Sequence, residues 1–206
     1  MLSVLTGDIV HSSTHENPAD WLDPLKNLFQ KTGKTPETWE FYRGDSFQIE
    51  VNPTDSLKLA LQIKAIVKQV DGLDVRVAIG IGQKSFDSPR VSESTGDAFV
   101  RSGRLLEWLK KKNMTMAVKS HDPLFDEEIN MMFKLALITI NSWSINSAET
   151  AGIMLSNPDL PQKKISKRLQ IAQSSVSERI RRGALYEILE LESYYRKRIQ
   201  RLTPEL

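Results

Sequence analysis

The order of apolar patterns along the chain restricts the fold more than any other feature of the sequence. Over the first 118 residues, short apolar runs typical of strands alternate with longer runs whose apolar residues have helical spacing. From Asp122 onward only the helical spacing remains, with breaks near Ser144 and Pro158. The chain therefore predicts an α+β domain over residues 1–120 and an all-α domain over residues 121–206.

Within the first domain the expected order is strand, helix, strand hairpin, helix, strand, helix and strand. This order predicts a ferredoxin-like sandwich, with a mostly antiparallel sheet and helices on one of its faces. Gly80 and Gly82 close one strand run, and close packing of a helix or a bulge is favoured for them over direct contact with a phosphate. Large apolar side chains at helical or strand spacing are expected in the core. They include Trp21, Trp39, Trp108, Met114, Met116, Met131, Met132 and Met154.

Two Gly-Asp pairs stand where short apolar strands meet turns. Gly7-Asp8 follows the run 1–5, and Gly44-Asp45 separates two strand-like runs. If these strands are neighbours in one sheet, the carboxylates converge, and Mg²⁺ is held in proteins by one or two carboxylates plus substrate phosphates. Either pair alone is more often a simple turn. The two together favour a metal site and a phosphate-bearing ligand.

Composition narrows the chemistry further. The chain has no cysteine and 3 histidines, so a bound metal would be held by oxygen ligands. No apolar run is long enough to span a membrane, and the first residues lack the charge pattern of a signal peptide. We therefore expect a cytoplasmic protein with no membrane partner.

The C-terminal part carries most of the positive charge. Residues 161–206 contain 11 Lys+Arg and 5 Asp+Glu, whereas the rest of the chain contains 17 and 21. Residues 161–183 have helix-turn-helix spacing, with a turn at 171–173 and Ser174 as the cap of the second helix. A long helix follows, and its apolar stripe is suited to packing a homodimer. DNA is the partner that this pattern favours, and a helical bundle with a basic exposed face is the alternative.

In the DNA-binding interpretation, the second helix enters the major groove and the flanking basic residues contact phosphates. The side chains that face the major groove would be Ser174, Ser175, Ser177, Glu178 and Arg181. Those that contact phosphates would be Lys163, Lys164, Lys167 and Arg182.

Four stretches of the first domain occur in an order known from one family. They are Gly7-Asp8-Ile9-Val10, Arg43-Gly44-Asp45-Ser46-Phe47, the run 76–82 and the run 96–105. Together they resemble the class III nucleotidyl cyclase fold. With the helix-turn-helix tail, the chain is similar to the SatD family of small bacterial proteins.

The resemblance implies roles for individual residues. Asp8, Asp45 and the Ile9 carbonyl would hold Mg²⁺ or Mn²⁺, and Gly44, Glu93 and Arg104 would contact the nucleotide. Arg104 matches the arginine that neutralises charge on the transferring phosphoryl group, which in such cyclases reaches across a dimer interface.

Two positions depart from the cyclase pattern. Val100 stands where the family has a ribose-orienting asparagine, and Phe41 where it has a purine-reading lysine. Neither side chain can donate a hydrogen bond, and misplacing a substrate even slightly costs roughly 10²-fold in rate. The sequence therefore favours nucleotide binding over turnover.

Three hypotheses follow. The leading one is a nucleotide- or phosphate-responsive DNA-binding regulator with a cyclase-like sensor domain. The second is a divergent Mg²⁺- or Mn²⁺-dependent nucleotidyl cyclase or related phosphoryl-transfer enzyme. The third is a protein-binding module with neither activity, for which metal and nucleotide titrations would both be flat.

Overall fold

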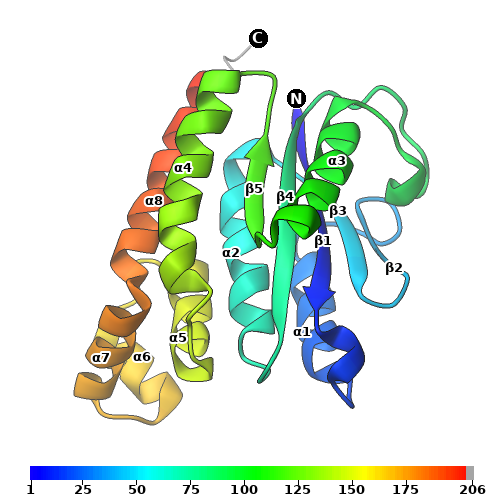
Figure 1. Cartoon of the computed structure of the whole chain (residues 1–206). Helices are drawn as coiled ribbons and strands as arrows, with labels where there is room; N and C mark the ends of the chain where they lie inside the picture. Colours follow the sequence, from blue (N-terminus) through cyan, green and yellow to red (C-terminus); the bar gives the residue numbers. More distant parts are fainter. Residues whose placement is uncertain (203–206) are drawn as a thin grey trace.

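The computed structural model describes residues 1–202, which fold as an α+β protein with one five-stranded mixed sheet and eight α-helices (Figure 1). The strands are β1 (Leu2–Val10), β2 (Trp39–Tyr42), β3 (Ser46–Val51), β4 (Asp74–Gly82) and β5 (Met116–Lys119). Their order in the sheet is β2-β3-β1-β4-β5. All neighbours are antiparallel except β4 and β5, which are parallel, so the α+β class is confirmed and the sheet is mixed.

The helices follow in the expected order, and a 3₁₀ turn precedes each of the first three. The helices are α1 (Ala19–Gln30), α2 (Ser56–Val67), α3 (Asp97–Lys112), α4 (Pro123–Ile140), α5 (Ile145–Ser156), α6 (Gln162–Leu169), α7 (Gln173–Gly183) and α8 (Leu185–Leu202), and the turns are η1 (Ser12–Thr14), η2 (Pro53–Asp55) and η3 (Val91–Glu93). Side-chain caps begin the helical part: Asp122 accepts from two backbone amides of α4, and Ser144 accepts from one of α5.

Helices cover both faces of the sheet, which corrects the expectation of helices on one face. Along β4, Val77 and Ile79 point into the large core under α1 and α2, while Ala78 packs with α3 on the other face. Gly80 also faces α3, and a Cβ atom there would lie 2.2 Å from the carbonyl oxygen of Ala98. The predicted role of this glycine in close helix packing is confirmed.

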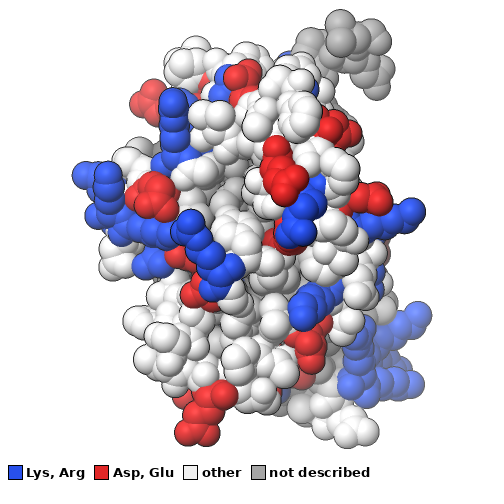
Figure 2. Space-filling model, turned by 90° about the vertical axis from the view of Figure 1, so that its right-hand side faces the viewer, with Lys and Arg blue, Asp and Glu red and all other residues white. Residues whose placement is uncertain are grey.

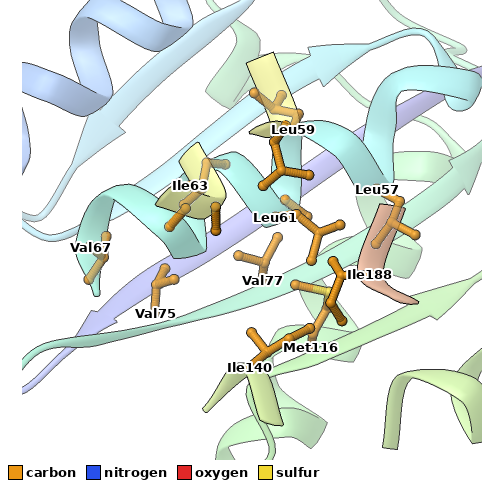
Figure 3. Packing of buried hydrophobic residues seen from close by; sticks show 14 of the residues in the cluster. Leu57, Leu59, Leu61, Ile63, Val67, Val75, Val77, Met116, Ile140 and Ile188 are labelled. Atoms are coloured by element: carbon orange, nitrogen blue, oxygen red, sulfur yellow. The ribbon is translucent and has the colours of Figure 1, made fainter. Parts of the chain in front are cut away.

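Helix α2 is buried on two sides. Its Leu61 lies next to Val77 of β4, and Ile140 of α4 and Ile188 of α8 belong to the same cluster from the helical part (Figure 3). One hydrophobic cluster therefore runs from the sheet through α2 to the C-terminal helices. The segments predicted as two domains share this core.

A buried polar cluster reinforces the same junction. The ammonium of Lys64, on α2, lies 2.6 Å from a carboxylate oxygen of Asp74 and donates to the side-chain oxygen of Asn141 over 2.7 Å. Thr115 donates to the same amide oxygen over 2.9 Å. Burial lowers the pKa of Lys64 to about 8, although Asp74 opposes the shift. Because a buried charge without a partner is costly, these contacts fix the end of α4 against α2 and β4.

Several core expectations are confirmed and others are wrong. Trp21, Trp39 and Met116 are buried, but Trp108 is 41% exposed and Met131 is 54% exposed. The apolar stripe of α8 is buried within the chain through Leu185, Ile188, Tyr195 and Ile199, so it is not free to pack a second copy as expected. In residues 1–202, every helix is too short or too polar to cross a membrane.

The contact between β4 and α3 yields a stability prediction. Gly80→Ala should destabilise the protein by about 1–3 kcal/mol, because the new methyl group meets the α3 backbone. Gly103→Ala is the matched control, since a Cβ at Gly103 meets nothing within 4 Å. As Gly103 lies inside α3, alanine there should stabilise by up to about 1 kcal/mol. Urea unfolding measures both, and equal stability of the two variants would contradict the packing described.

Candidate functional site

A polar row crosses four strands on the α3 side of the sheet. The register places Tyr42, Ser46, Asp8 and Arg76 directly beside one another, on β2, β3, β1 and β4 in turn. Asp8 shares the face of Thr6, two residues earlier on β1, and the hydroxyl of Thr6 donates to Ser102 of α3 over 2.9 Å. Strand alternation thus directs the Asp8 carboxylate toward α3 and away from the large core.

Two cations flank the Asp8 carboxylate. One oxygen lies 3.5 Å from the Arg76 guanidinium, and the other lies 3.5 Å from the ammonium of Lys110, in the last turn of α3. Burial alone would lower the pKa of Lys110, but Glu107 and Asp8 outweigh it and the pKa is raised. Burial raises the pKa of Tyr42, against the opposing charges of Lys110 and Arg43. Asp8 is therefore already paired with two positively charged side chains.

The second Gly-Asp pair lies beside the first. The backbone amide of Ile9 donates to the carbonyl of Asp45 over 3.1 Å. The hairpin that presents Asp45 turns at Arg43 and Gly44, whose φ angles are 54° and 85°. Positive φ angles strain most side chains, which explains the glycine at residue 44, while Arg43 adopts the left-handed region in spite of its side chain. The predicted proximity of the two pairs is therefore found in the backbone.

The two carboxylates nevertheless have separate partners. One Asp45 oxygen accepts from the Ser12 hydroxyl over 2.7 Å, and the other accepts from Ser46 over 3.2 Å. Asp8 instead pairs with Arg76 and Lys110. Among residues 1–202 there is no group of three or more His, Cys, Asp or Glu that could hold a metal ion. An ion at this position would depend on two carboxylates and backbone oxygen.

The other residues that were predicted to contact the nucleotide lie apart from this polar row. Arg104 is exposed on α3, and because successive helical residues are about 100° apart it points away from the sheet-facing Ser102. In the described part of the chain, no hydrogen bond or ion pair joins Arg104 to Asp8 or Asp45. Glu93, in η3, accepts from the Ser88 hydroxyl over 3.0 Å. The structure therefore brings Asp8, Ile9, Gly44 and Asp45 together. Arg104 and Glu93 of the same chain do not lie with them.

The structure also shows where Phe41 and Val100, the two residues that depart from the cyclase pattern, are located. Phe41 stacks on Phe29 of α1 with ring centroids 5.4 Å apart, so it belongs to the core face of the sheet. Val100 is an exposed side chain of α3.

Acidic and basic side chains are interspersed on the right-hand side of the molecule in Figure 1, where no single sign dominates (Figure 2).

Helices α6 and α7 carry the second candidate site. Residues 170–172 join them, and Gln170 ends α6 in the left-handed conformation with φ 54°. Helix α7 begins at Gln173 after Ala172, so Ser174 lies within the first turn and is not the cap that was expected. The side chains predicted to contact DNA are exposed apart from Glu178, which is half-buried: Lys163, Lys164, Lys167, Ser174, Ser175, Ser177, Arg181 and Arg182.

Charge on α7 is partly compensated within the helix. Glu178 accepts from Arg181 over 2.9 Å and from Arg182 over 2.7 Å, and these hydrogen bonds lower its pKa. On the inner side, Arg179 donates to Glu149 of α5 over 2.9 Å. The lysines of α6 have no ion-pair partner within residues 1–202. The free positive charge of this helix pair therefore lies mainly on α6.

Models of protein families, curated proteins and solved structures were compared with the chain, and none of them matches it. The functional argument therefore depends on the residues and contacts described above.

Proposed function

We propose that the protein is a DNA-binding regulator whose α+β part responds to a nucleotide or another phosphate-bearing ligand. The observation that carries the proposal is the pair α6 and α7, in which exposed, uncompensated lysines stand next to a helix with an exposed first turn. Lys163, Lys164 and Lys167 would contact phosphates, since such contacts supply most of the non-specific affinity for DNA.

The packing of α7 supports its role as a recognition helix. Val176 and Ile180 are buried against the neighbouring helices, and the indole of Trp143 donates to the carbonyl of Gly183 over 2.9 Å. These contacts hold one side of α7 and leave Ser174, Ser175 and Ser177 outward. In helix-turn-helix proteins it is the N-terminal residues of the second helix that contact base edges. Arg181, Arg182 and Glu178 would extend this surface.

The ligand would bind at the end of β1. The order of β2, β3, β1 and β4, crossed by α1 and α2, supports a ferredoxin-like, cyclase-like interpretation of this part. The carboxylates of Asp8 and Asp45 and the Ile9 carbonyl would hold Mg²⁺ or Mn²⁺, because hard cations prefer oxygen donors. These residues fit the ion if Lys110 turns away. Its ion pair with Asp8 is partly exposed and is therefore worth at most about 1 kcal/mol.

A divergent nucleotidyl cyclase or related phosphoryl-transfer enzyme is the second candidate. The hydrogen bond between Ile9 and Asp45 favours it, since it brings both Gly-Asp pairs to one place. Arg104 is exposed, so in an enzyme it would act on the ligand of another subunit, while Glu93 would contact the base. Incubation with each nucleoside triphosphate and Mn²⁺ separates the candidates: product that disappears in Asp45→Asn supports the enzyme.

The competition between Lys110 and a bound metal gives a prediction. Lys110→Met should raise the affinity for Mn²⁺ by roughly three- to tenfold, because a positive charge 3.5 Å from Asp8 is removed. Asp45→Asn should weaken binding. Lys111→Met is the control, since Lys111 is an exposed neighbour with no ion pair among the described residues. Isothermal titration calorimetry measures all three, and unchanged affinity in Lys110→Met and Asp45→Asn would contradict the proposed ion site.

DNA binding is tested by mobility shift and fluorescence anisotropy on genomic duplex fragments. Lys163→Ala and Lys167→Ala should each reduce the slope of log affinity against log salt by about 1, because each removes one phosphate contact. Lys34→Ala, an exposed lysine far along the chain, should leave the slope unchanged. Adding Mn²⁺ and nucleoside triphosphate should change the affinity of the wild-type protein but not of Asp45→Asn. Absence of any retarded fragment at moderate salt would end the regulator proposal.

A further inference from the structure

Helix α4 exposes four large apolar side chains along one side, which we name the α4 stripe. Leu124 is 76% exposed, Met131 54%, Leu135 64% and Ile138 73%. Residues spaced by three, four or seven positions lie on the same side of a helix, so these four form a continuous surface. The opposite side of α4 is buried in the core through Phe125, Ile129, Phe133 and Leu137. The helix is thus apolar on two sides, and only one of them is covered.

The stripe stands out from the rest of the surface. Helix α4 runs along the outside of the molecule beside α8 (Figure 1). Exposed Trp108 of α3 and Leu105 line a hollow of about 310 Å³ next to α4, together with Glu127 and Lys134. Large contiguous apolar surfaces are uncommon on monomers and mark interaction sites. Other exposed apolar side chains, such as Phe86, lie apart from α4.

We infer that the α4 stripe is the surface through which two copies of this chain associate, with the two α4 helices antiparallel. Leu124 and Ile138 each lie seven positions from Met131, which is near the middle of α4. A two-fold axis through Met131 therefore places Leu124 of one copy against Ile138 of the other, and both Met131 side chains on the axis. Such self-complementarity is what a two-fold interface requires.

Charge beside the stripe selects the antiparallel orientation. Glu127 and Lys134 lie on the same flank of the stripe, one on each side of Met131. Neither has an ion-pair partner within residues 1–202. In the antiparallel arrangement Glu127 of each copy faces Lys134 of the other, so two ion pairs form. In a parallel arrangement this flank of one copy would lie on the opposite side of the interface from the same flank of the other copy, so neither ion pair could form.

This inference does not depend on the proposed function, since it follows from α4 alone. It replaces the stripe of α8, which is buried in the chain, as the surface for a homodimer. It also provides the second subunit from which Arg104 could reach a ligand, but the association can be tested without any ligand or DNA.

Sedimentation velocity on the full chain tests the association. The wild-type protein should dimerise in a concentration-dependent manner, and Leu135→Glu and Ile138→Glu should each weaken dimerisation by at least tenfold. Phe86→Glu is the control, as it replaces an apolar side chain of comparable exposure, 58%, outside the stripe. Circular dichroism checks that each variant keeps its helices. A wild-type protein that stays monomeric at high micromolar concentration would overturn the inference.

Charge reversal tests the orientation. Glu127→Lys and Lys134→Glu should each weaken the dimer, because each sets like charges opposite one another. The double variant should recover most of the wild-type association. Additive losses in the double variant would refute the antiparallel pairing.

The absence of cysteine allows a second, independent test. Under mild oxidation, a mixture of Leu124→Cys and Ile138→Cys chains should form a disulfide between the two different chains. Leu124→Cys alone should not, because antiparallel pairing holds the two copies of residue 124 at opposite ends of the interface. Efficient disulfide formation by Leu124→Cys alone would indicate parallel pairing and contradict the inference, as would the lack of any product in the mixture.

Discussion

Burial of α2 on two sides is the constraint on which the rest of the structure depends. Helices that are apolar on most of their surface must be covered on most of their surface, and α2 meets this condition only between the sheet and the C-terminal helices. The same packing fixes α5 and α8 relative to β4. Lys64, buried within it, finds its charge partner on β4 and its amide partner at the end of α4. The basic helix pair is therefore attached to the sheet through a shared core.

The chemistry of the candidate site follows from the position of β1 in the middle of the sheet. Both neighbours of β1 are antiparallel, and the resulting register sets Asp8 between Ser46 and Arg76. Since α3 crosses the same face, Lys110 reaches the carboxylate from above. A cation that binds here competes with existing positive charge and does not enter a bare acidic pocket. Under the proposed function, binding of a metal ion would therefore displace Lys110 from Asp8.

Much of the fold could be predicted from the sequence, because the local patterns agree with the tertiary structure. Strand and helix order, the glycine at residue 80 against α3 and the adjacency of the two Gly-Asp pairs all follow from residue type and spacing. The contacts of Asp8 could not be predicted, since Arg76 depends on strand register and Lys110 on which face α3 covers. Placing α3 on the second face required knowledge of the β4 to β5 connection, whose parallel pairing no local motif specifies.

Errors in the predicted core have one physical origin. Periodicity shows that a side of a helix is apolar, but it does not show whether the chain itself covers that side. Met131 and Trp108 were expected inside for this reason, and both lie exposed next to or on the α4 stripe. The stripe of α8 was expected to face a partner, yet Tyr195 on that stripe is buried and hydrogen-bonded to Ser56. The same ambiguity affects any amphipathic helix that is predicted from sequence alone.

The shared core is the central claim, because a ligand at β1 can influence α7 only if the two parts fold as one unit. Native-state amide hydrogen exchange measures this most directly, as it gives an opening free energy for each backbone amide. We expect the most protected amides of β1, α2 and α5 to open with the same free energy in one cooperative transition. If the amides of α5 to α8 open at a much lower free energy than those of β1, the helical part unfolds independently and the account is contradicted.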